Sequence, residues 1–124
     1  MDGPAITEAE IGGLVDAFYA RVRCDALLGP VFASAIGDWP PHLATLKDFW
    51  SSVMLTSGRY KGSPMAAHLK HAGAIRPEMF ARWLALWRAT ALELLPREKA
   101  EAVAAKAERI GESLGLALFF RIGG

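Results

Sequence analysis

Apolar residues recur every three or four positions along most of this chain, a spacing that predicts α-helices. The first predicted helix follows Thr7, which forms a candidate capping box with Glu10 three residues later. Its apolar face consists of Ile11, Leu14, Val15, Phe18 and Val22. Tyr19 lies one turn beyond Val15, so its ring is expected near this face, although an amphipathic tyrosine with a surface hydroxyl fits the spacing equally well.

The segment from Asp25 to Phe32 has a weaker helical pattern. It contains Gly29-Pro30, a pair that interrupts helices, so only a short helix is predicted here. The chain is expected to turn before Val31, which places Phe32 in a corner and not on a regular element.

A second long helix is predicted to begin after Asp38, a candidate N-cap, with Pro40 and Pro41 in its first turn. It ends near Gly58, and its apolar face continues through Leu43, Leu46, Phe49, Trp50, Val53 and Met54. Counting back along that face by threes and fours leads to His42. The His42 imidazole is therefore expected to point toward the core from the first turn.

Three further helices complete the pattern. A short one is predicted from Pro64 to His71, with Met65, His68 and Leu69 on one side. A long one begins at Pro77 and carries Trp83 on its inner side, and the last follows Pro96. No strand signal and no repeat is found, so the predicted fold class is all-α.

Length and charge exclude several classes of protein. The 124 residues predict a single domain over 1–124, and the net charge of +1 offers no polyelectrolyte surface for nucleic acid. The chain begins without a secretory signal pattern, contains no apolar run of bilayer length, and has Cys24 as its one cysteine. We therefore expect no membrane contact, no internal disulfide and a cytoplasmic location.

Several aromatic and polar rings fall on the predicted inward faces. They are Tyr19, Phe32, His42, Phe49, Trp50, His68 and Trp83. A polar ring on an apolar face is costly unless something buried there needs it. Haem fits this requirement, because its iron takes an axial imidazole on one side and a diatomic ligand on the other. His68 is the candidate axial ligand, and the Tyr19 hydroxyl and the Trp83 indole N–H are candidate donors to the bound ligand.

The order and spacing of these residues resemble a known family. The matching motifs are Phe18-Tyr19, Val22-Arg23, Leu28-Gly29-Pro30-Val31-Phe32, Trp39-Pro40-Pro41-His42, Phe49-Trp50, Tyr60-Lys61-Gly62, His68, Phe80 and Trp83-Leu84. Together they resemble a truncated haemoglobin of the third group. The resemblance implies a globin-like, truncated two-over-two helical sandwich.

The resemblance also implies roles for single residues. Tyr19 and Trp83 would contact the bound ligand, and His42 would stand at the distal entrance. His68 would ligate the iron. The residues expected to contact a haem b are Phe32, His42, Leu46 and Trp83. The expected partners are diatomic gases and an electron-donating reductase, with the protein a monomer or weak dimer.

Other interpretations stay open for several of these residues. His71 lies three positions after His68 and is a second candidate for the iron ligand, although it adjoins the predicted helix end at Ala72-Gly73. Phe49 and Trp50 are typical of a plain hydrophobic core. Pairing of Arg59, Lys61 or Lys70 with haem propionates competes with a solvated basic loop.

Three classes of function compete at this point. The first is a haem protein that binds dioxygen, nitric oxide or a similar ligand. The second is a haem redox enzyme, either peroxidase-like or oxidising nitric oxide. The third lacks haem and is a helical interaction module or a zinc site formed by His68, His71, His42 and Cys24. A zinc site normally has two pairs of closely spaced Cys or His ligands. This chain has only one such pair, His68 and His71, which argues against the zinc site.

Overall fold

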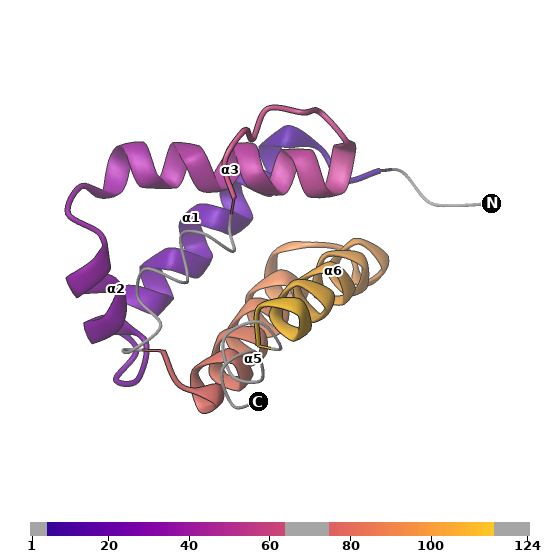
Figure 1. Ribbon diagram of the computed structural model, residues 1–124. Coiled ribbons are helices and arrows are strands. Elements are labelled where there is room, and N and C mark those ends of the chain that lie inside the picture. The colour runs from indigo at the N-terminus through magenta and orange to yellow at the C-terminus, as the bar shows by residue number, and fades with distance from the viewer. Residues whose placement is uncertain (1–4, 64–74, 116–124) are drawn as a thin grey trace.

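The computed structural model describes residues 5–63 and 75–115, and every regular element within these ranges is an α-helix (Figure 1). The helices are α1 (Glu8–Cys24), α2 (Gly29–Ala35), α3 (Trp39–Leu55), α5 (Pro77–Leu94) and α6 (Arg97–Gly115). The all-α prediction is confirmed. The predicted short helix from Pro64 to His71 lies outside the described residues.

The predicted capping box at the start of α1 is present. The backbone N–H of Glu10 donates to Oγ1 of Thr7 at 3.1 Å, and the Thr7 N–H donates to Oε1 of Glu10 at 2.9 Å. Both donors would otherwise lack a partner within the helix. The start of α3 differs from its prediction, because Asp38 occupies the N-cap position but its side chain makes no capping hydrogen bond.

The prediction that Phe32 lies in a corner is wrong, since Phe32 is part of α2. Pro30 occupies the first turn of this helix, where a missing N–H costs nothing, so Gly29-Pro30 starts the helix and does not interrupt it. The Phe32 N–H donates to the Leu28 carbonyl at 3.1 Å, and the Phe32 carbonyl accepts from the Ile36 N–H at 2.8 Å.

A close backbone approach holds α2 against the end of α1. A Cβ atom added at Gly29 would lie 2.9 Å from the Arg23 carbonyl oxygen, so only glycine fits without a shift of the backbone. The Asp25 side chain organises the same turn, because its Oδ2 accepts from the N–H groups of Leu27 and Leu28 at 3.1 and 3.0 Å.

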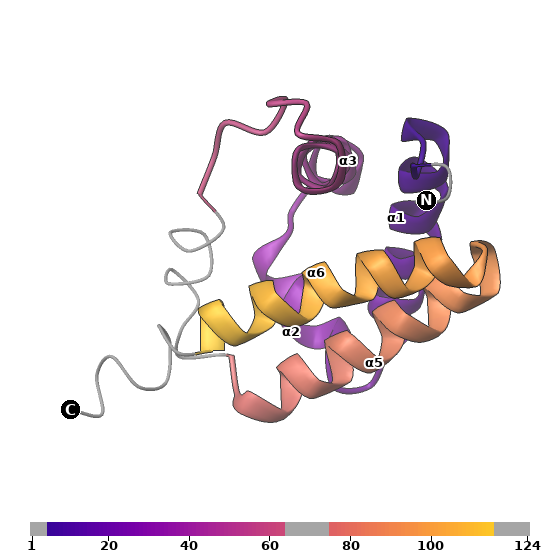
Figure 2. The same ribbon diagram turned by 90° about the vertical axis from the view of Figure 1, so that its right-hand side faces the viewer.

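The helices form two pairs, as the resemblance to the truncated family implied. Helices α5 and α6 run antiparallel beside one another, and α3 crosses α1 (Figures 1 and 2). Helix α1 also packs against α5, which joins the two pairs, and α2 packs on α1. None of the helices in the described ranges has the length and apolar character needed to span a membrane.

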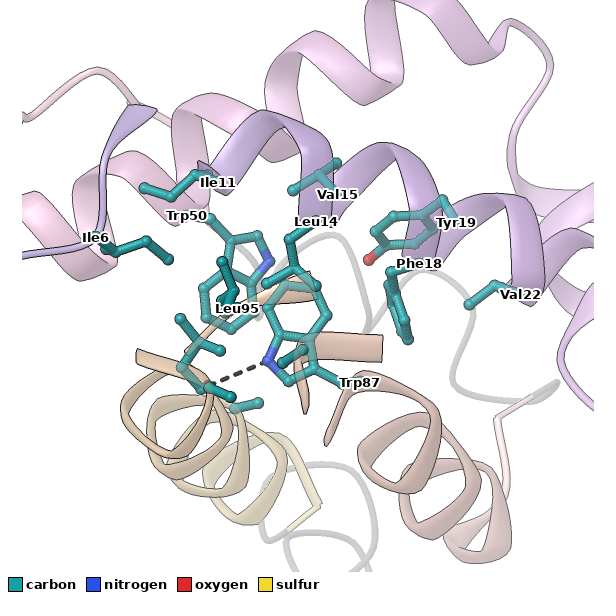
Figure 3. Close-up of a cluster of buried hydrophobic side chains, with 14 of the residues drawn as sticks. Ile6, Ile11, Leu14, Val15, Phe18, Tyr19, Val22, Trp50, Trp87 and Leu95 are labelled. Carbon is teal, nitrogen blue, oxygen red and sulfur yellow. Dashed lines mark hydrogen bonds between the residues drawn. The ribbon is translucent and has the colours of Figure 1, made fainter. Parts of the chain in front are cut away.

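The core lies where α1, α3, α5 and α6 meet (Figure 3). Trp50 of α3 and Trp87 of α5 stack at its centre, with ring centroids 4.3 Å apart. Trp87 is 1% exposed, and its indole N–H donates to the Val103 carbonyl of α6 at 3.1 Å. This hydrogen bond supplies the partner that a buried indole requires.

Candidate functional site

Beside this core lies a cavity of about 460 Å³, lined by residues of the five described helices and of the connections between them. Its volume falls within the range of ~300–1,000 Å³ that is usual for small-molecule and cofactor sites. It is lined by Tyr19, Leu28, Val31, Phe32, Ala35, Ile36, His42, Thr45, Leu46, Phe49, Trp50, Tyr60, Ile75, Met79, Phe80, Trp83, Ile110, Gly111 and Leu114. Most of these side chains are apolar, so the cavity suits a large hydrophobic group with a few polar contacts.

The cavity brings together the site residues predicted on four separate elements. Tyr19 of α1, Phe32 of α2, His42 and Leu46 of α3, and Trp83 of α5 all line it. His68 and the competing candidate His71 lie outside the described residues, as does Lys70.

Tyr19 is deeply buried in the cavity wall, with 4% of its surface exposed. Burial raises the pKa of Tyr19 to about 12, against the opposing effect of a hydrogen bond with Trp83. An indole N–H can only donate, so Trp83 is the donor in this bond and the Tyr19 oxygen is the acceptor. The phenolic proton of Tyr19 is therefore left to donate elsewhere.

His42 lies at the side of the cavity and is only partly buried. Burial lowers its pKa below the usual value of 6.5, which favours the neutral imidazole. Its ring meets that of Trp39 edge-on, with centroids 5.7 Å apart. Trp39 in turn stacks on Phe32 at 6.4 Å, and the Arg23 guanidinium lies 4.7 Å from the centre of a Trp39 ring. His42 is thus supported by aromatic packing against Trp39.

Several lining residues were missed by the predicted site. Ile110, Gly111 and Leu114 come from α6. In the sequence, the apolar stripe of this helix has the pattern of an ordinary hydrophobic core. Tyr60 lies in the loop after α3, where its N–H donates to Oγ of Ser52 at 2.9 Å and its ring meets Phe49 edge-on at 5.1 Å. An aromatic residue in a polar loop was the available signal for Tyr60.

Tyr60 and Ile75 lie close to the two ends of residues 64–74, in which His68 occurs, and both line the cavity. The cavity wall therefore includes residues on both sides of His68 in the sequence.

The lining fits a haem in its chemistry. Phe32 and Leu46 offer apolar surface, and Tyr19 and Trp83 offer donors at one part of the wall. For the competing metal interpretation, no group of three or more His, Cys, Asp or Glu side chains is placed to hold a metal ion within residues 5–63 and 75–115.

Comparison with known proteins agrees with this chemistry. No family model matches the chain. The chain is 36% identical over 91 residues to the group 3 truncated haemoglobin ctb of Campylobacter jejuni, which covers 70% of this chain and 71% of that protein. The crystal structure of the group III truncated haemoglobin from Campylobacter jejuni matches with a TM-score of 0.84, at 30% identity and with 96% of each chain covered.

Proposed function

Since this chain belongs to the group 3 truncated haemoglobins, we propose that it binds dioxygen, nitric oxide or a similar diatomic ligand at a haem b held in the cavity. Haem-based binding of small ligands is the function that the family implies. The choice of ligand, the five-coordinate iron and the roles of single residues are the parts that we propose.

Bound in the cavity, haem would supply an iron with one face open to a diatomic ligand. His68 is the proposed protein ligand on the other face, which leaves the iron five-coordinate. Phe32 and Leu46, both partly buried in the cavity wall, would contact the porphyrin. The proximity of Tyr60 and Ile75 to the stretch that carries His68 supports this assignment.

Tyr19 and Trp83 are the proposed donors to the ligand. The observation that carries the proposal is the pairing of these two groups at the cavity wall, with a phenolic proton that the Trp83 bond does not use. Bound dioxygen carries partial negative charge, and the Tyr19 O–H would donate to it. The Trp83 N–H, which the Tyr19 oxygen accepts here, would become the second donor by turning from that oxygen to the ligand, and two such donors would slow ligand release. Slow release favours ligand capture or conversion over oxygen transport.

The test of the proposed function is spectroscopic. Protein purified from haem-replete cells should show a Soret band, and its ferrous form should have the spectrum of five-coordinate iron. Protein without a Soret band under these conditions would contradict the proposal. Stopped-flow measurement of dioxygen dissociation would then give the ligand's release rate.

A second candidate function is redox catalysis on the same cofactor, as a peroxidase-like enzyme or in the oxidation of nitric oxide. The observation that favours it concerns His42, whose imidazole lies at the cavity and is partly exposed. Its partial burial lowers its pKa. Such a group can pass protons between cavity and solvent near neutral pH. Peroxide turnover above that of a matched myoglobin would support this function, and an equal rate would contradict it.

The redox function would need a reductase as electron donor, which we propose as a partner of the monomer or weak dimer. Reduction of the ferric protein by candidate reductases, followed at the Soret band, tests the partner. Sedimentation velocity at several concentrations tests the oligomeric state.

A further inference from the structure

We propose that the contact between the Arg23 guanidinium and the Trp39 ring sets how fast diatomic ligands enter and leave the cavity past His42, while their affinity stays unchanged. The proposal rests on the proposed function, because it concerns the ligand side of the same cavity. Arg23 and Trp39, both in the described part of the chain, lie outside the cavity lining. They are therefore positioning residues, which act on the ligand through His42.

A group of partly exposed rings adjoins Tyr19, the proposed donor to the ligand. The Tyr19 ring centroid lies 5.8 Å from that of Phe32 and 6.1 Å from that of Trp39, and Trp39 contacts His42. A ligand that approaches Tyr19 from this side must pass these rings. Phe32 is proposed to contact the haem, which leaves His42 as the lining ring that can turn aside.

The backbone between Trp39 and His42 is stiff. The two residues are three positions apart in the first turn of α3, which puts their side chains on one face of the helix. Pro40 and Pro41 lie between them, and each proline ring fixes its own φ. His42 can therefore move away from Trp39 only by rotation of its side chain, and the place of the Trp39 ring limits that rotation.

Arg23 holds the Trp39 ring from α1. Tyr19 and Arg23 are four positions apart, so they lie on adjacent turns of one face of α1, and both contact Trp39. The Arg23 guanidinium lies 4.7 Å from the centre of a Trp39 ring, a distance at which a cation is attracted to the ring face. Arg23 is exposed, so a shorter side chain at this position leaves no hole in the core.

A looser Trp39 ring would let His42 turn out of the cavity more often. This lowers a barrier that the ligand crosses in both directions, so association and dissociation should become faster by the same factor. The ratio of the two rates is the affinity, which should not change. Loss of a ligand donor such as Tyr19 differs, because it speeds dissociation alone.

The first test measures both rates in the haem-loaded, full-length protein. Dioxygen association is followed by laser flash photolysis and dissociation by stopped-flow displacement. In Arg23→Gln we expect both rates to rise about two- to five-fold, the factor that an exposed cation–π contact is worth, with an unchanged Kd. Arg23→Lys keeps the cation and should stay closer to wild type. Arg88→Gln is the control, because Arg88 is an exposed arginine that pairs with Glu101 outside the cavity lining.

A double variant tests whether Arg23 acts through Trp39. Trp39→Leu removes the ring that Arg23 contacts, so it should raise both rates by itself. Arg23→Gln added to Trp39→Leu should then raise them no further. An additional rise of the same size as in the single variant would overturn the route through Trp39.

The second test needs no haem. Diethyl pyrocarbonate modifies accessible neutral histidines, and mass spectrometry gives the rate at each position in the haem-free protein. His42 should be modified several-fold faster in Arg23→Gln than in wild type or Arg88→Gln, with His68 and His71 as internal references.

Several results would overturn the proposal. Equal association rates in Arg23→Gln and wild type would mean that ligands do not pass His42 under the control of Arg23, and a faster dissociation alone would indicate a lost ligand donor instead. Unchanged modification of His42 would mean that Arg23 does not position this ring. A missing Soret band would be a failure of the proposed function, and the modification of His42 distinguishes it from a failure of the positioning.

Discussion

Arg82 and Asp25 form an ion pair that joins α5 to the turn after α1, with Nη2 of Arg82 2.7 Å from Oδ1 of Asp25. The Asp25 side chain is only 7% exposed, and its second oxygen accepts the N–H groups of Leu27 and Leu28. The hydrogen bond from Arg82 is the largest of the effects that lower the pKa of Asp25. One carboxylate thus fixes both the entry to α2 and the position of α5.

Asp25→Ala should lower the free energy of unfolding at pH 7 by about 1–3 kcal/mol, because donors to a charged acceptor lose their partner. A folded-state pKa below the usual ~3.9 contributes stability above that pH, and the contribution is lost as the pH falls through the folded-state value. Asp25→Asn should therefore flatten the acid side of the stability curve. Urea unfolding at a series of pH values measures both the loss of stability in Asp25→Ala and the pH dependence of stability in Asp25→Asn. Asp16→Asn, in an exposed pair with Lys47, is the control and should change little.

Tyr19→Phe and Trp83→Phe should each speed dioxygen dissociation, by a factor on the order of ten per ~1.4 kcal/mol of lost hydrogen bonding. Stopped-flow displacement from the ferrous protein measures the rate. Thr45→Val is the matched control in the same cavity, because the Thr45 hydroxyl already donates to the Pro41 carbonyl at 3.1 Å. Unchanged rates in both Tyr19 and Trp83 variants would mean that neither group donates to the ligand.

His68→Ala should release haem or abolish the five-coordinate ferrous spectrum, because it removes the proposed axial ligand. His71→Ala should retain both properties. Absorption spectra and the rate of haem transfer to apomyoglobin distinguish the two variants. The reverse result would assign the iron to His71.

His42 should make the stability of the protein depend on pH below neutrality. Its pKa is lowered in the folded state, so the unfolded chain binds more protons between the folded value and about 6.5. The free energy of unfolding of wild type, relative to His42→Gln, should be constant above that window and fall as the pH decreases through it. Thermal or urea unfolding across this range gives the difference, and a difference that does not change with pH would argue against a partly buried, neutral imidazole.

Gly29→Ala should destabilise the protein by roughly 1–3 kcal/mol, because the added methyl group meets the Arg23 carbonyl and forces a backbone shift. Gly13→Ala is a control of opposite sign. Gly13 lies in α1 with nothing within 4 Å of an added Cβ, so alanine should stabilise the helix by about 0.5–1 kcal/mol. Equal effects at the two positions would contradict the steric explanation.

The helices were predictable where the signal is local. Thr7 and Glu10 identified the start of α1, and Pro77 that of α5, because caps and first-turn prolines act within one turn of helix. Phe32 was misplaced because Gly29-Pro30 is typical both of a turn and of a helix start. The deciding contact, with the Arg23 carbonyl, depends on how the chain packs.

The cavity was predictable to the extent that its residues carry unusual chemistry on an apolar face. Tyr19, His42 and Trp83 met that condition and line the cavity together. Ile110 and Leu114 did not, since an apolar stripe has the same pattern whether it faces a cavity or another helix. The hydrogen bond between Trp83 and Tyr19 joins helices that are distant in sequence, and no local pattern specifies such a pair.

The cavity walls come from both ends of the chain, from Tyr19 in α1 to Leu114 in α6. The hollow is complete only once α6 has packed beside α5, so a haem bound at the proposed site would hold together helices that are far apart in the sequence. Haem that binds the folded chain and not the unfolded one would raise the free energy of unfolding by mass action, so a larger haem supply during expression should raise the share of folded protein.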